Sequence, residues 1–177
     1  MRKIVIDGYN YSGKSELVSD IQINISDALV FQTFDSNIGE FFMWLYNNKR
    51  YRLANDVLLN TVFMKDICNK NVYGEDDNLI IYDTHWLTMF SILPEKYWST
   101  WFPLPKTIIC WASGNKTIEN MINSGLKQVF CGGVDYNCKL YFEIAQMFIC
   151  EHIKFIDTTK IERNAVLDQA LEFIGCN

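Results

Sequence analysis

The sequence has no apolar run close to the roughly 20 residues that a membrane-spanning helix needs. It has no N-terminal segment with the pattern of a secretory signal. Its six cysteines form no Cys-x-x-Cys pair and no cluster with zinc-ligand spacing. We therefore expect a cytoplasmic protein that makes no membrane contact and whose thiols are reduced and mostly buried.

Positive charge is also scarce. The 16 Lys and Arg residues are outnumbered by 21 Asp and Glu residues, which gives a formal net charge of −5. Binding along duplex DNA is therefore not expected, because it needs a basic face that releases counterions. Repeats, low-complexity segments and linkers are absent as well. The 177 residues, 49% of them hydrophobic, fit a single globular domain over 1–177.

Short apolar segments alternate with longer segments of helical period. Buried strands are expected at 3–7, 28–34, 78–83, 107–111 and 153–157. Helices are expected at 14–23, 38–47, 55–70, in part of 86–101, and at 117–126, 136–152 and 162–174, with Thr158 or Thr159 as the cap of the last. This alternation predicts one α/β domain, a three-layer αβα sandwich with a five-stranded parallel sheet.

The strongest chemical signal follows the first expected strand. Residues 8–15 satisfy G-x-x-x-x-G-K-[ST] at every fixed position. The glycines let the backbone bend closely around a phosphate, and successive N–H groups form an anion-binding nest at the start of a helix. The predicted ligands are ATP and Mg²⁺, and the loop residues that bind them are Gly8, Tyr9, Asn10, Tyr11, Ser12, Gly13, Lys14 and Ser15.

Three residues in and beyond this loop carry the predicted chemistry. Lys14 places a positive charge on the β- and γ-phosphates, and the Ser15 hydroxyl takes one coordination position of Mg²⁺. Asp83 ends the third expected strand, where an acidic residue of this fold lies near the metal and the γ-phosphate. Alternatively, Asp83 only caps the helical segment that follows it. His85, two residues further on, is expected to be structural.

With these motifs the sequence resembles the P-loop nucleoside and nucleotide kinases, most of all the thymidylate kinases, over most of its length. The family motif G-x-D-x-x-G-K-[ST] is matched, with Asn10 where the family usually has Asp. The mid-chain helix pattern of the family is echoed from Leu58 to Lys65, and its Asp-Arg-Tyr strand end is echoed by Asp83-Thr84-His85. The resemblance implies the P-loop kinase fold with a short lid segment at 113–133.

The resemblance also implies roles for further residues. Asn10, Phe63 and Lys65 would contact the acceptor, and Phe63 would stack on its base unless it simply packs in the core. Lys127 in the lid would assist phosphoryl transfer, and Thr158 would lie on the adenine side of the donor nucleotide.

Arginine is where the sequence departs from the family. Only Arg2, Arg50, Arg52 and Arg163 are present, and the arginine of Asp-Arg-Tyr is replaced by Thr84. The lid segment offers lysines where the family carries arginines that grip the transferring phosphoryl group. Lysine cannot offer a phosphate the two parallel hydrogen bonds that the planar guanidinium of arginine offers. The acceptor's own phosphate is therefore held differently, or the acceptor carries none.

The first hypothesis is ATP-dependent phosphoryl transfer to a (deoxy)nucleoside monophosphate, a step of nucleotide biosynthesis. A deoxynucleoside kinase, or a kinase for another hydroxyl, is the alternative; Asp35 would then take the proton of the 5′-hydroxyl, unless it only caps the next helix. A nucleotide-binding protein without catalysis is the third reading. The apolar helix at 38–45 suggests a homodimer interface.

Overall fold

The computed structural model describes residues 2–34, 36–73, 78–126 and 129–175. Its strands form one all-parallel sheet in the order β2-β3-β1-β4-β5. They are β1 (Arg2–Asp7), β2 (Leu29–Gln32), β3 (Leu79–Asp83), β4 (Thr107–Trp111) and β5 (Ile153–Asp157). The helices are α1 (Lys14–Asn24), α2 (Ser36–Asn47), α3 (Tyr51–Tyr73), α4 (Trp86–Phe90), α5 (Gly114–Asn123), α6 (Cys131–Met147) and α7 (Arg163–Ile174), with a 3₁₀ helix η1 (Glu95–Trp101).

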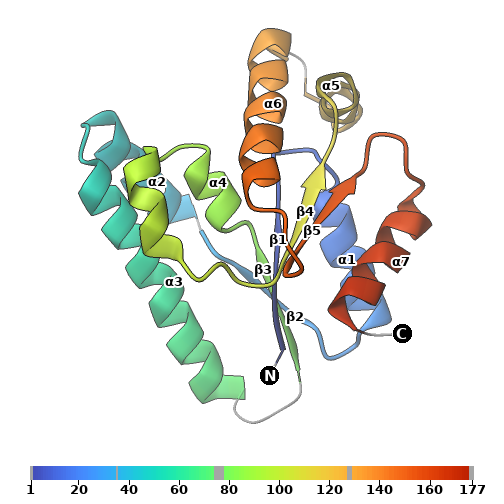
Figure 1. The fold of residues 1–177 in the computed structure, drawn as a ribbon, viewed down its shortest axis with the longest axis horizontal. Coiled ribbons are helices and arrows are strands. Elements are labelled where there is room, and N and C mark those ends of the chain that lie inside the picture. The colour runs from blue at the N-terminus through green and yellow to red at the C-terminus, as the bar shows by residue number, and fades with distance from the viewer. Residues whose placement is uncertain (1, 35, 74–77, 127–128, 176–177) are drawn as a thin grey trace.

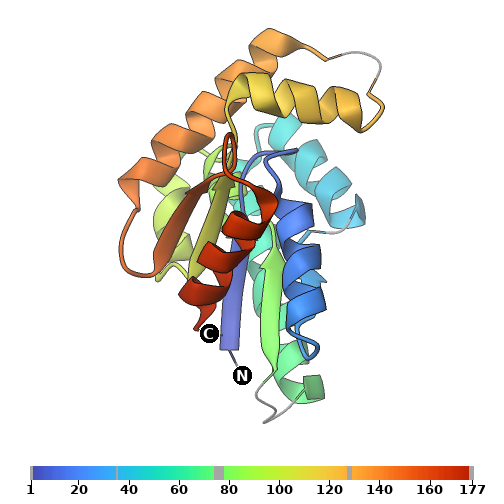
Figure 2. The ribbon, with the colours of Figure 1, turned by 90° about the vertical axis from the view of Figure 1, so that its right-hand side faces the viewer.

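Helices cover both faces of the sheet (Figures 1 and 2). Ile4 and Ile6 of β1 pack with α1 and α7 on one face, and Val5 points to the opposite face. Because both faces are covered, the strands are continuously apolar rather than alternating. The predicted αβα sandwich with a five-stranded parallel sheet is therefore confirmed.

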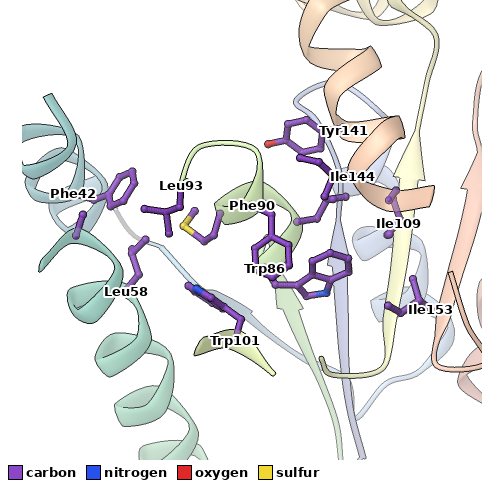
Figure 3. Close-up of a cluster of buried hydrophobic side chains, with 14 of the residues drawn as sticks. Phe42, Leu58, Trp86, Phe90, Leu93, Trp101, Ile109, Tyr141, Ile144 and Ile153 are labelled. Atoms are coloured by element: carbon purple, nitrogen blue, oxygen red, sulfur yellow. The ribbon is translucent and has the colours of Figure 1, made fainter. Parts of the chain in front are cut away.

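The larger core cluster fills the face covered by α2, α3, α4 and α6. Trp86 and Phe90 of α4 pack edge to face, with ring centroids 5.2 Å apart, and both lie against Phe148. Figure 3 shows Trp86 and Phe90 beside Ile144 of α6 and Ile109 of β4. The first and last residues of the short helix α4 thus pack into this core through their aromatic rings.

Two local expectations from the sequence were wrong. The last helix is not capped by a threonine: its N-cap is Glu162, and the Thr159 hydroxyl instead accepts a hydrogen bond from the Ser113 backbone N–H, at 2.9 Å. Thr159 therefore joins the end of β5 to the start of α5.

The thiols are free among the described cysteines, yet three of these five are exposed, namely Cys68, Cys131 and Cys150. In the part of the chain that the structure describes, no helix has the length and apolar character to cross a membrane.

The carboxylate of Asp7, at the end of β1, is fully buried and joins three elements. One oxygen accepts the backbone N–H of Gly8 (2.8 Å) and the hydroxyl of Thr88 (2.7 Å). The other accepts the backbone N–H groups of His85 and Leu87, each at 2.9 Å, and of Thr88 at 3.3 Å. Asp7 therefore satisfies the open N–H groups at the start of α4 while it holds the first residue of the glycine loop.

We expect Asp7→Asn to lower the free energy of unfolding by about 3 kcal/mol, because an amide cannot accept hydrogen bonds at both ends and leaves buried donors unpaired. Urea denaturation measures this loss. Asp168→Asn, on the exposed side of α7, is the matched control and should change the unfolding free energy little. Equal stability of the two variants would contradict the anchoring role of Asp7.

Candidate functional site

The loop between β1 and α1 has a backbone that only glycine fits at its first position. Gly8 has φ +144°, and a Cβ built there would lie 2.1 Å from the carbonyl oxygen of Cys110 in β4. Gly13 is the N-cap of α1 in the left-handed region, with φ +92°. The loop thus closes tightly over the end of the sheet and brings its N–H groups to the positive end of the α1 dipole.

Neighbouring elements support the loop from outside. The Thr158 hydroxyl lies 2.8 Å from the carbonyl oxygen of Ser12, and its side chain packs against Gly13. The amide of Asn120 in α5 donates to the carbonyl oxygen of Tyr11 at 2.9 Å, and α5 lies close beside the loop (Figure 2). The Ser12 hydroxyl is buried without a hydrogen-bond partner. A glycine cradle with a buried hydroxyl left unpaired fits a bound phosphate group.

Lys14 and Asp83, both of which the sequence analysis expects near the phosphates, lie close together beside this loop. The Lys14 ammonium lies 3.9 Å from the nearest carboxylate oxygen of Asp83 and donates to the Thr84 hydroxyl at 2.8 Å. The side chains of Lys14 and Asp83 are 10% and 21% exposed. The cap of α4 is not Asp83, since its N-cap position is His85 and Asp7 accepts the N–H groups of its first turn. Asp83 is therefore left to face Lys14.

A cleft of about 910 Å³ runs from the loop along α1. At one end it is lined by Asn10, Tyr11, Gly13, Lys14, Ser15 and Thr158, which are predicted loop and nucleotide residues, and by Lys116 of the expected lid. The other end is lined by Asp20, Ile161, Arg163 and Val166, with Asn120, Asn123 and Ser124 of the α5 region along one side. The cleft therefore extends well past the glycine loop.

An ion pair that the sequence did not predict lies at the far end of this cleft. Arg163 Nε donates to Asp20 Oδ2 at 2.7 Å, and Arg163 Nη2 donates to Asp20 Oδ1. These bonds from Arg163 hold the pKa of the Asp20 carboxyl below its usual value. Nothing in the local sequence links positions 20 and 163, which meet only because α1 and α7 pack side by side.

The residues predicted to contact the acceptor are more dispersed. The Lys65 ammonium donates to the backbone carbonyls of Gln32 and Thr33 at the end of β2. Phe63 lies on α3 with 62% of its surface exposed, and Asn10 lines the cleft rather than a separate acceptor pocket. Asp35 and Lys127 fall outside the described residues. The acceptor site thus stays a prediction for these positions.

His85 is buried between the rings of Tyr82 and Trp101, at centroid distances of 6.1 and 5.5 Å. Its Nδ1 atom has no hydrogen-bond partner. Burial lowers the pKa of His85 to about 4, so the imidazole is neutral at pH 7. This agrees with the structural role expected for His85.

Mg²⁺ is the metal that the sequence leads us to expect here. Among the described residues, no group of three His, Cys, Asp or Glu side chains is placed to hold a metal by itself. A hydroxyl at Ser15 and a carboxylate at Asp83 are nevertheless the hard oxygen donors that Mg²⁺ takes when it shares its coordination with nucleotide phosphates. The residues present fit a metal that arrives with a nucleotide.

Comparison with solved structures places the fold. The chain is similar over 98% of its length to thymidylate kinase from Candida albicans, with TM-score 0.68, 16% identity and 91% of that chain covered. It is also similar over 98% of its length to deoxyadenosine kinase from M. mycoides with bound dATP, with TM-score 0.62, 14% identity and 99% of that chain covered. The fold is that of the P-loop nucleotide kinases.

This likeness confirms the fold that the sequence resemblance implied. No protein-family model and no curated protein sequence matches the chain. At 13–16% identity the likeness concerns the arrangement of the backbone. The chemistry must therefore be argued from the residues of this chain.

We expect Gly8→Ala to lower the free energy of unfolding by about 2–3 kcal/mol, because its new Cβ collides with a strand backbone that cannot move freely. Any rise in Tm on addition of ATP should be lost at the same time. Gly39→Ala is the matched control: nothing lies within 4 Å of its new methyl group, and alanine in helix α2 should stabilise by up to about 1 kcal/mol. A Gly8→Ala protein that is as stable as Gly39→Ala and responds to ATP would contradict the close approach described for the loop.

Proposed function

We propose that this protein is a kinase that transfers the γ-phosphoryl group of ATP to a (deoxy)nucleoside monophosphate. The observation that carries the proposal is the placement of Lys14 and Asp83. A nearly buried ammonium lies 3.9 Å from a carboxylate oxygen beside the N–H groups of a glycine loop, and Lys14 also lines a long cleft. Such a site suits a polyphosphate with its metal and offers little to an uncharged ligand.

Each residue then has a distinct task. The loop N–H groups and the α1 dipole hold the β-phosphate. The Lys14 ammonium stabilises the negative charge of the phosphoryl group that is transferred. Ser15 and Asp83 would hold Mg²⁺, which when bound neutralises charge on the phosphate oxygens. Catalysis on this account is positioning and charge stabilisation, with no covalent intermediate on the protein.

The cleft has room for the rest of the donor. Asp20 lies six residues after Lys14 on α1, which is about 9 Å along the helix axis. That spacing suits a ribose and a base beyond the phosphates. Ile161 and Val166 offer apolar contacts there. The side chain of Arg163 is 63% exposed, and its guanidinium is fixed in orientation by Asp20. A planar cation of this kind is suited to stacking on an aromatic base.

Two observations bear on the acceptor. The similarity to thymidylate kinase spans nearly the whole chain and supports a nucleoside monophosphate. The second candidate is a deoxynucleoside, supported by the similarity to deoxyadenosine kinase and by the groups found at positions 65 and 84. Lys65 is engaged with two backbone carbonyls, and Thr84 stands where the resembled family has arginine. Neither arrangement is built to grip a phosphate on the acceptor.

We also propose that the protein acts in the cytoplasm and as a homodimer. Phe41 and Trp44 on α2 are 48% and 60% exposed and stack on each other, with ring centroids 6.2 Å apart. Leu53 of α3 is also exposed. Light scattering measures the mass in solution, and a mass of twice 20.7 kDa is the expected result.

We expect Lys14→Ala to lower turnover by roughly a thousandfold with little loss of stability, because the transition state loses its main positive charge. The assay is ADP release from ATP and Mg²⁺ with a panel of nucleosides and nucleoside monophosphates. Lys139→Ala, an exposed lysine of α6, should keep wild-type turnover.

The panel also separates the candidates. ADP release that depends on a monophosphate supports the first, and dependence on a nucleoside supports the second. ADP release without dependence on any acceptor, or full activity of Lys14→Ala, would contradict the proposed function.

A further inference from the structure

The hydroxyl of Thr84 bridges the two charged groups of the site. It accepts a hydrogen bond from the Lys14 ammonium at 2.8 Å and lies 3.2 Å from Oδ1 of Asp83, to which it donates. The ammonium and the carboxylate are 3.9 Å apart, too far for a direct hydrogen bond. The contact between the two charges therefore passes through one neutral hydroxyl.

Burial makes this bridge consequential. Both charged side chains are largely withdrawn from water, and a buried charged group needs hydrogen-bond partners at a defined distance. If the ammonium and the carboxylate met directly, they would form a closed ion pair. With the hydroxyl between them, the two charged groups stay 3.9 Å apart.

The backbone of Thr84 is held in an unusual conformation. Its φ is +68°, a value rare for a β-branched residue, and its N–H donates to the carbonyl oxygen of Ile6 at 2.9 Å. Glycine would adopt this conformation without strain. A threonine kept in such a conformation beside two charged groups indicates that its side chain is needed there.

We infer that Thr84 is a positioning residue that holds Lys14 and Asp83 at their working separation; this inference rests on the proposed function. Thr84 fixes the direction of the ammonium toward the phosphates and the orientation of the carboxylate beside it. It replaces the arginine of the resembled family with a group that acts on the donor side of the site. Thr84 itself is not expected to contact the reacting atoms.

Three substitutions separate the hydroxyl from the backbone effect. Thr84→Ser keeps the hydroxyl, Thr84→Val keeps the shape without it, and Thr84→Gly removes the hydroxyl while relieving the positive φ. Thr61→Val, which removes a hydroxyl from α3 far from the loop, is the control. Calorimetry measures ATP affinity in EDTA, without metal; ADP release then gives kcat and KM, and thermal unfolding gives stability.

We expect Thr84→Val and Thr84→Gly to weaken ATP binding by roughly tenfold each, as the loss of a hydrogen bond to a charged group implies. Thr84→Ser and Thr61→Val should bind ATP as the wild type does. Thr84→Gly should be at least as stable as Thr84→Val, so that affinity and stability change independently.

Wild-type affinity in both Thr84→Val and Thr84→Gly, or a glycine variant that binds ATP normally while the serine variant does not, would overturn the inference and leave the proposed function standing. A wild-type protein that binds no ATP would overturn both.

Discussion

The buried carboxylate of Asp7 is the interaction on which the site depends. It accepts hydrogen bonds from the first residue of the glycine loop and from the N-terminal turn of α4. The first N–H groups of a helix have no partner within the helix, and the N-cap residue of α4, His85, offers no side-chain cap. The Asp7 side chain therefore fixes both the start of the loop that follows β1 and the start of the helix that follows β3. Asp83 and Thr84 come directly before that helix start.

The sheet order explains why the charged groups meet. β1 and β3 are neighbours, and Ile6 is in register with Asp83. In a parallel sheet the carboxyl ends of neighbouring strands lie at one edge, and ligands of open α/β sheets bind there. Lys14 reaches the same edge from the first turn of α1. The site is thus a consequence of strand order and of a loop that turns back sharply over Cys110.

Much of this could be predicted from the sequence, because the signals are local. The buried strands and the glycine loop follow from apolar runs and from a motif of eight residues, whereas the expected place of Asp83 came from the fold that this pattern predicts. The Asp20–Arg163 pair could not be found, because it depends on the packing of two helices that are distant in sequence. Asp7 was open to prediction as an acidic residue between an apolar strand and Gly8, but its partners at the start of α4 lie about eighty residues away. Thr159 failed as a cap because the nearby start of α5 offered it a backbone donor.

The scarcity of arginine distinguishes this chain from the family that it resembles. Beside the glycine loop, the Lys14 ammonium and the Asp83 carboxylate lie 3.9 Å apart with the Thr84 hydroxyl between them, and Lys116 lines the same end of the cleft. Arg163, the first residue of α7, lies at the far end of the cleft, and its guanidinium donates to the carboxylate of Asp20.

The most direct test of this account is a crystal structure of the protein with ATP and Mg²⁺. We predict that the β- and γ-phosphates lie against the backbone N–H groups of residues 13–15 and the Lys14 ammonium, with the base beside Arg163. A nucleotide bound elsewhere with the glycine loop empty would contradict the account.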